Sequence, residues 1–140
     1  MIVYVDGSVK LRIILEDGDL IAGWERWTAT FSIDLSYVEC RRVLDRLRLT
    51  GELGGTRLSA AIVGLERIEA ECTHVPVRRD VIERASMSLT KVVRTLDAIH
   101  LATAIILRES GLDLVFATHD RQQAVAAATL GFTVIGVNIA

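Results

Sequence analysis

The stretch "MIVYV", residues 1–5, decides the fold class because its apolar and β-branched side chains do not alternate with polar ones. A strand that is covered on both faces has this pattern, whereas a strand with one solvated face alternates. Asp6 and Gly7 follow directly and indicate a turn. The stretch therefore predicts an inner strand of a parallel sheet.

Further apolar strands alternate with helical segments along the rest of the chain. We expect strands at 30–34, 72–77, 112–118 and 132–137, and helices within 9–15, 19–27, 36–49, 56–71, 78–89, 95–109 and 120–131. Alternation of this kind favours parallel strands joined by right-handed helical crossovers. The sequence predicts an α/β fold, a three-layer α/β/α sandwich with a central, mostly parallel sheet.

Length and composition favour a single domain that spans residues 1–140. The chain has 140 residues, of which 51% are hydrophobic, and no repeat or proline-rich linker divides it. Its formal net charge of -2 excludes a chain that is basic overall. A polyanionic ligand such as RNA would have to be held by local charges.

The sequence also predicts a cytoplasmic protein without a membrane segment. Its first residues lack the positive region of a leader, and no apolar run reaches the ~18 residues of a membrane span. Cys40 and Cys72 lack the spacing of a zinc site or a disulfide framework. We expect both cysteines to be small buried side chains.

Four acids stand at the starts of expected helices or the ends of expected strands, and an ordinary structural role is open for each. Glu39 lies three residues after Ser36, the spacing of a capping box. Asp97 falls in the first turn of helix 95–109, where the helix dipole favours an anion and Thr95 would be the cap. Asp6 fits a turn, and Asp120 fits an N-cap.

The expected topology gives the same four acids a second interpretation. Asp6 and Asp120 follow the carboxyl ends of parallel strands, and Glu39 and Asp97 open helices, so all four can border one crevice. Carboxylates gathered there would raise one another's pKa unless a cation compensated. Mg²⁺ or Mn²⁺ prefers oxygen ligands and activates water for phosphodiester hydrolysis. Asp97 would then start its helix at the rim of a metal site.

Four segments together resemble the PIN-domain ribonucleases, specifically the VapC-type toxins of bacterial toxin–antitoxin (VapBC) modules, and the resemblance runs nearly end to end. They are "VYVDGS" (3–8), "SYVECRR" (36–42), "TLDAIHLATA" (95–104) and "ATHDRQQAVAAATLGFTVI" (117–135). The resemblance implies a Mg²⁺- or Mn²⁺-dependent endoribonuclease that cuts structured RNA such as tRNA or rRNA. It also implies a cognate VapB-type antitoxin and a homodimer.

By position, the resemblance implies that the metal-binding and catalytic acids are Asp6, Glu39, Asp97 and Asp120, with Ser8 and Thr118 as supporting polar residues. Gly7 departs from the family pattern, because many relatives carry a hydroxyl residue at this position. The fourth acid is the least uniform within the family. Direct binding of a metal by Asp120 therefore stays open.

Outside the acids, several side chains are candidates for contacts with RNA or a partner. Four arginines could approach RNA phosphates, namely Arg41, Arg42, Arg94 and Arg121. Leu20, Trp24 and Trp27 could receive the antitoxin. His100 is expected to be a structural histidine.

Two other protein classes share some of these sequence features. A catalytically weak module that binds RNA or protein stays open. A phosphatase of the haloacid dehalogenase type is disfavoured, because its first-strand signature needs an aspartate at the position of Ser8.

Overall fold

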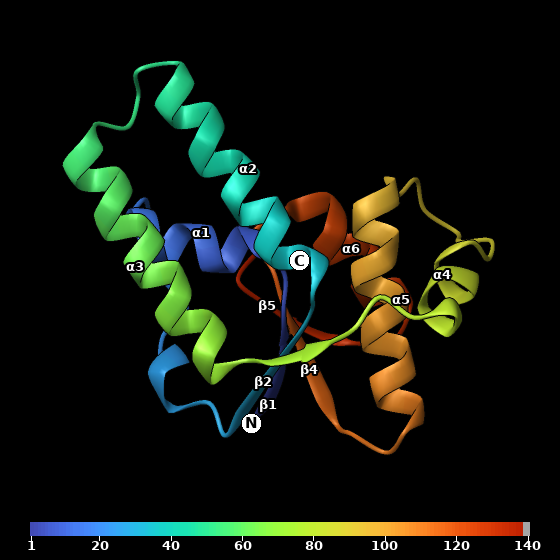
Figure 1. Cartoon of the computed structure of the whole chain (residues 1–140). Coiled ribbons are helices and arrows are strands. Elements are labelled where there is room, and N and C mark those ends of the chain that lie inside the picture. Colours follow the sequence, from blue (N-terminus) through green and yellow to red (C-terminus); the bar gives the residue numbers. More distant parts are fainter. Residues whose placement is uncertain (139–140) are drawn as a thin grey trace.

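The computed structural model describes residues 1–138, and a single five-stranded, all-parallel sheet is its centre (Figure 1). The strand order is β3-β2-β1-β4-β5. The strands are β1 (Ile2–Val5), β2 (Ala29–Ile33), β3 (Thr73–Val75), β4 (Leu114–Ala117) and β5 (Thr133–Ile135). The predicted α/β sandwich with a central parallel sheet is confirmed. Of the expected domain 1–140, the last two residues lie outside the described part.

β1 is the middle strand, as its unbroken apolar pattern predicts. It pairs with β2 on one side and β4 on the other, so that Tyr4 lies opposite both Phe31 and Phe116. Val3 and Tyr4 are fully buried because helices cover both faces of the sheet. The end of β1 is therefore surrounded by neighbouring elements on every side.

Six helices form the outer layers: α1 (Gly7–Leu15), α2 (Leu35–Leu49), α3 (Gly55–Glu71), α4 (Arg79–Ala85), α5 (Thr95–Glu109) and α6 (Arg121–Thr129). The helices α5 and α6 pack on the face of the sheet that carries Tyr4 and Phe116. The opposite face, which carries Val3 and Val5, is covered by α1. None of the helices within residues 1–138 is both long and apolar enough to cross a membrane.

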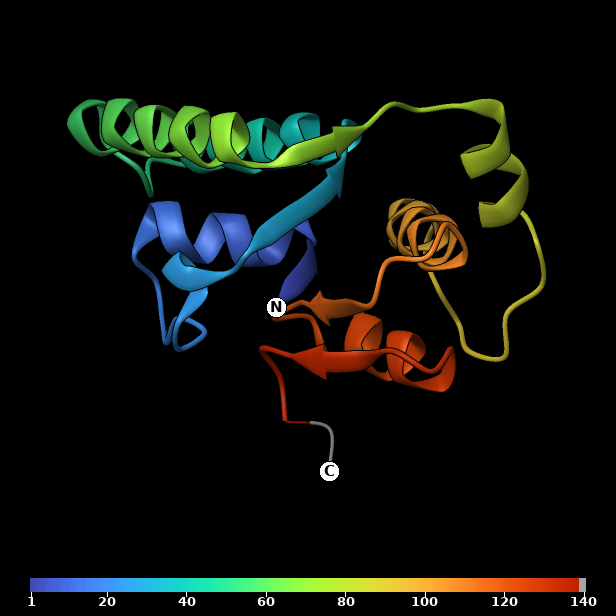
Figure 2. The ribbon, with the colours of Figure 1, turned by 90° about the horizontal axis from the view of Figure 1, so that it is seen from below.

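A hairpin of α2 and α3 packs on the outer side of α1 and projects beyond the sheet (Figures 1 and 2). Its core contains Cys40, Leu44 and Leu65, which are almost completely buried. The two helices are joined by a turn in which Gly51 has a φ of +78°, a conformation that favours glycine. The hairpin fixes the start of α2 beside the start of α1.

The helix expected at 19–27 is absent, and this prediction is wrong. Only a single 3₁₀ turn forms, η1 (Trp24–Arg26), within an irregular segment that links α1 to β2. Gly18 and Gly23 adopt positive φ angles of +86° and +78°, which no α-helix accommodates. The apolar side chains Ile21 and Trp27 of this segment pack instead against the core cluster of Val3, Val5, Val9 and Ala117.

Two of the predicted helix caps are also wrong. Helix α2 begins at Leu35 after Asp34, and the Oγ of Ser36 is buried without a hydrogen-bond partner, so no capping box forms with Glu39. At α5, the N-cap is Arg94 rather than Thr95, although Asp97 does lie in the first turn. Glu39 is thereby released for a different partner.

Candidate functional site

Asp6 is held at the end of the central strand by two hydroxyl groups. Its backbone N–H donates to the carbonyl oxygen of Ala117 on β4, at 3.2 Å. Its Oδ1 accepts from the backbone N–H of Ser8 at 3.0 Å and from Ser8 Oγ at 2.5 Å, and its Oδ2 accepts from Thr118 Oγ1 at 2.5 Å. The carboxylate is 4% exposed, so these bonds fix its orientation.

The same two hydroxyls bind the loop between β4 and α6. Ser8 Oγ accepts from the backbone N–H of His119 at 2.9 Å, and Thr118 Oγ1 accepts from the backbone N–H of Asp120 at 3.0 Å. Asp120 Oδ1 in turn accepts from the backbone N–H of Gln123 at 3.1 Å, so Asp120 is the N-cap of α6 as predicted. The structure thus connects Asp6 to Asp120 through Thr118.

Glu39 reaches the site from the second turn of α2 and contacts α5. Its Oε1 lies 3.0 Å from Nε2 of His100, a residue with no exposed surface. On the other side of the imidazole, Nδ1 lies 2.8 Å from the hydroxyl oxygen of Tyr4. A β-carbon at Gly7 would overlap the Glu39 carboxylate, with 2.6 Å to its Cδ. Glycine at this position therefore makes room for Glu39.

Asp97 lies in the first turn of α5, and its carboxylate accepts no hydrogen bond from any residue within 1–138. Its backbone oxygen accepts from Gln123 Nε2 at 3.1 Å, which ties the start of α5 to α6. Burial raises the pKa of Asp97, and the negative charges of Asp120, Asp6 and Glu39 raise it further, while His100 opposes them. The free carboxylate thus lies within electrostatic reach of the other three acids.

The pKa of Asp6 is also raised, first by burial. The charge of His100 and the hydrogen bonds from Ser8 and Thr118 lower it, and the charge of Glu39 raises it again. These mutual effects show that the four acids, which come from four different elements, share one electrostatic environment. The arrangement concentrates negative charge at the carboxyl ends of the parallel strands.

The donor set suits a hard divalent cation, because it consists of carboxylate oxygens with hydroxyl support. The side chains are not assembled around such an ion, however. Within residues 1–138, no three His, Cys, Asp or Glu side chains stand close enough together to hold a metal. Binding would require these carboxylates to move closer together.

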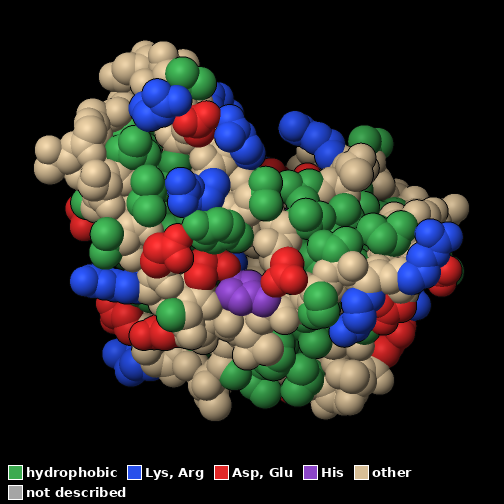
Figure 3. Space-filling view, in the orientation of Figure 1, with side chains coloured by type: hydrophobic (Ala, Val, Ile, Leu, Met, Phe, Trp, Pro, Cys, Tyr) green, Lys and Arg blue, Asp and Glu red, His purple; other side chains and the backbone are tan. Residues whose placement is uncertain are grey.

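The candidate RNA-binding arginines lie on two sides of this region. Arg41 and Arg42 belong to α2, where Arg41 donates to the Tyr37 hydroxyl at 3.0 Å and Arg42 pairs with Asp45 at 2.7 Å. Arg94 precedes α5, and Arg121 begins α6. Figure 3 shows a notch between α2 and the α5 side of the molecule, with lysine and arginine side chains on both sides of it.

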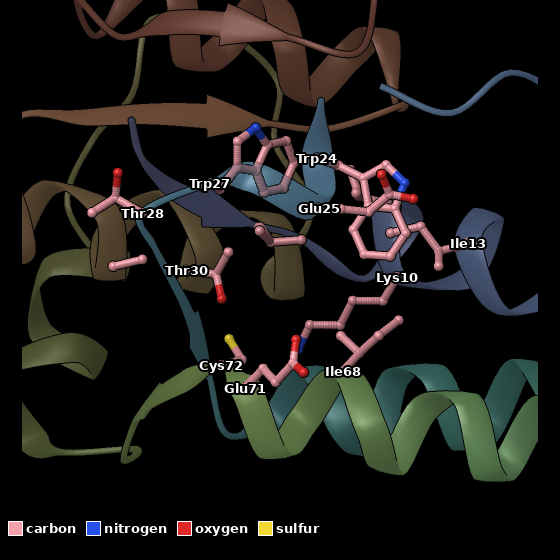
Figure 4. A pocket seen from close by; sticks show the side chains of 13 residues that line it. Lys10, Ile13, Trp24, Glu25, Trp27, Thr28, Thr30, Ile68, Glu71 and Cys72 are labelled. Atoms are coloured by element: carbon pink, nitrogen blue, oxygen red, sulfur yellow. The ribbon is translucent and has the colours of Figure 1, made fainter. Parts of the chain in front are cut away.

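Trp24 and Trp27 lie elsewhere, in a pocket of about 220 Å³ between α1, β2 and the end of α3 (Figure 4). Lys10 also lines this pocket, and its buried ammonium group donates to Glu69 Oε1 at 2.6 Å. None of the four acids lines the pocket. Leu20, the third candidate for partner binding, is 42% exposed and lies outside it.

Sequence reasoning missed two residues of the acid site. Tyr4 is part of an apolar strand and is indistinguishable from a core residue in the sequence. Gln123 is 1% exposed and bridges Asp97 to α6, while its own Oε1 has no partner within residues 1–138. Gln123 lies three residues after Asp120, the predicted N-cap of α6. This spacing could have placed Gln123 in the first turn of the helix, beside the expected crevice.

No family model matches the chain, and no curated protein matches it. Among solved structures, the chain is similar to the crystal structure of PAE2754 from Pyrobaculum aerophilum, with 21% sequence identity and a TM-score of 0.53. The alignment covers 92% of each chain. A likeness at this level of identity supports the fold alone.

Asp97→Asn tests, in the absence of any ligand, whether the negative charge of Asp97 destabilises the folded protein. Because the pKa of Asp97 is raised in the folded state, its ionisation weakens folding, and stability falls as the pH rises above the ordinary aspartate value of 3.8. We expect the variant to have an equal or larger free energy of unfolding than the wild type at pH 7. The difference should disappear near pH 3, as measured by urea denaturation at several pH values.

Asp45→Asn is the matched control, because Arg48 and Arg42 lower the pKa of this exposed carboxyl group. Its stability contribution is present at neutral pH and is lost as the pH falls through the lowered pKa. The control should therefore change stability in the opposite direction. A clear loss of stability at pH 7 in Asp97→Asn would instead show that its interaction with the helix dipole dominates.

Proposed function

We propose that the protein is a metal-dependent endoribonuclease of the PIN-domain, VapC-type toxin class, which uses Mg²⁺ or Mn²⁺ to hydrolyse RNA phosphodiester bonds. The observation that carries the proposal is the convergence of Asp6, Glu39, Asp97 and Asp120 into one electrostatic environment at the strand ends. Such a group of acids, with two raised pKa values, is typical of a site that works with a cation.

In this proposal, each acid has a distinct task that follows from its contacts. Asp6 presents a carboxylate that Ser8 and Thr118 hold in a single orientation. Asp97 and Asp120 keep oxygens free to turn toward a ligand, and Glu39 faces them from α2. When bound, a divalent ion would lower the pKa of a water molecule and stabilise the leaving oxygen.

RNA would approach through the notch, because a negative pocket needs positive charge at its rim to hold a polyanion. Arg94 is the strongest candidate contact, since it is exposed and its guanidinium group has no partner within residues 1–138. Arg42 and Arg121 would have to leave Asp45 and the carbonyl oxygen of Asn138, respectively. Arg41 is held by Tyr37.

The proposal includes a VapB-type antitoxin, a homodimer and a cytoplasmic location, which rest on the family resemblance. The indole rings of Trp24 and Trp27 line one pocket. They would provide an apolar, aromatic surface that a partner could bury. The exposed Leu20 lies on the irregular segment that precedes them.

A second candidate function is a binding module that holds RNA or protein without cutting it. The observation that favours it is the lack, within the described chain, of three acids arranged to hold a metal.

Cleavage of labelled RNA separates the two candidates. We expect the purified protein to cut tRNA or rRNA with Mg²⁺ or Mn²⁺ and to lose at least ~100-fold in rate in EDTA, because no other nucleophile is supplied. Asp6→Asn and Asp97→Asn should lose activity similarly, while Asp80→Asn, which alters a carboxylate paired with Arg78, keeps it. Binding of RNA with no metal-dependent cleavage would support the module and reject the enzyme.

Arg94→Ala should weaken RNA binding by removing one phosphate contact. We expect the slope of log Kd against log salt concentration to decrease by about 0.7 for single-stranded RNA. The measurement is fluorescence anisotropy, and both proteins also carry Asp97→Asn so that the RNA is not cut. Arg79→Ala is the control, because Arg79 lies on α4 and pairs with Glu83. Equal slopes for both variants would exclude Arg94 from the RNA contact.

A further inference from the structure

A continuous line of buried contacts connects the central strand to the acid site through α5. Tyr4 on β1, His100 on α5 and Glu39 on α2 follow one another at 2.8 and 3.0 Å, although 96 and 61 residues separate the partners in sequence. Tyr4 and His100 have no exposed surface. Water therefore has no access to the contact between Tyr4 and His100, whereas the Glu39 side chain at the other end of the line is 22% exposed.

The chemistry of the groups determines which atoms carry protons. An ionised glutamate only accepts hydrogen bonds, so Nε2 of His100 must be the donor to Glu39 Oε1. The Tyr4 hydroxyl lies 2.8 Å from Nδ1 on the other side of the ring, where it can donate to a neutral imidazole or accept from a charged one. Tyr4 thus holds the imidazole in place from the side opposite Glu39.

Gly7 confines the same oxygen of Glu39 from the other side. A β-carbon at this position would overlap Oε1, so the carboxylate lies directly against the glycine. The neighbouring Cys40 thiol is 3.7 Å from the carbonyl oxygen of Gly7, which keeps α2 close to the start of α1. Oε1 is enclosed between His100 and Gly7, and Oε2 is the oxygen left for a ligand.

We propose that His100 is a positioning residue, with Tyr4 as the group that fixes the orientation of its ring: together they hold Glu39 so that only Oε2 is offered to a divalent cation. The inference rests on the proposed function, because it assumes that the acid site binds such an ion. Partners that orient a metal-binding side chain commonly change metal affinity by about 10- to 100-fold when they are removed.

Titration of the metal-free protein with Mn²⁺, followed by calorimetry, tests this role without measuring cleavage. His100→Gln can place an amide N–H near the former Nε2, whereas His100→Asn is too short to reach Glu39. We expect His100→Gln to bind Mn²⁺ within about threefold of the wild type and His100→Asn to bind about 10- to 100-fold more weakly. Tyr4→Phe removes one oxygen atom, and should weaken binding about tenfold while the protein stays folded.

Nitrogen chemical shifts of the His100 side chain provide a second measurement, which needs no metal. The wild type should show a protonated Nε2, because this nitrogen donates to Glu39. If His100→Asn does not fold, the Mn²⁺ affinity of Tyr4→Phe decides the outcome. A wild-type imidazole with its single proton on Nδ1 would overturn the inference.

Combining variants separates a direct role from a general loss of structure. In a Glu39→Gln background, adding His100→Asn should leave the Mn²⁺ affinity unchanged within about twofold, because the oxygen that it positions is already altered. An equal further loss in that background would overturn the inference. So would wild-type affinity in both His100→Asn and Tyr4→Phe. Failure of the wild type itself to bind Mn²⁺ would instead reject the proposed function, and the inference with it.

Discussion

The site depends on a carboxylate, that of Asp6, which is buried at the end of the middle strand. Burying this charge is costly, and the cost is offset by hydrogen bonds from Ser8 and Thr118. Because the same hydroxyls accept from the backbone of His119 and Asp120, one anion fixes the start of α1, the end of β4 and the start of α6. The position of the other acids follows from this arrangement.

The parallel arrangement of the strands explains why the acids are crowded together. All five strands end on the same side of the molecule, so each chain reversal after a strand brings polar groups to one edge of the sheet. Desolvation and mutual repulsion act on Asp6 and Asp97 there, and both effects raise the pKa values of these acids. The surrounding structure holds the charges together although they repel, as is common where a fold has been shaped for binding or chemistry.

Strong periodic patterns made part of this structure predictable. The unbroken apolar run of β1 and the long apolar helix of α5 were placed almost at their observed ends, because burial on several faces leaves a clear signal. The segment 19–27 was misread because its apolar spacing resembles a helix, while Gly23 within it and Gly18 just before it have positive φ angles that prevent one. Local spacing could not reveal that Glu39 contacts His100, 61 residues away, instead of capping its own helix.

The pairing of β1 with β4 also constrains the order in which the molecule can assemble. Residues 2–5 hydrogen-bond to residues 114–117, so β1 waits for a neighbour that is synthesised more than 100 residues later. Contacts of such long range form slowly. Thr118, which binds Asp6, and Asp120 follow that neighbour directly. A nascent chain therefore cannot gather its acids until most of it has been translated.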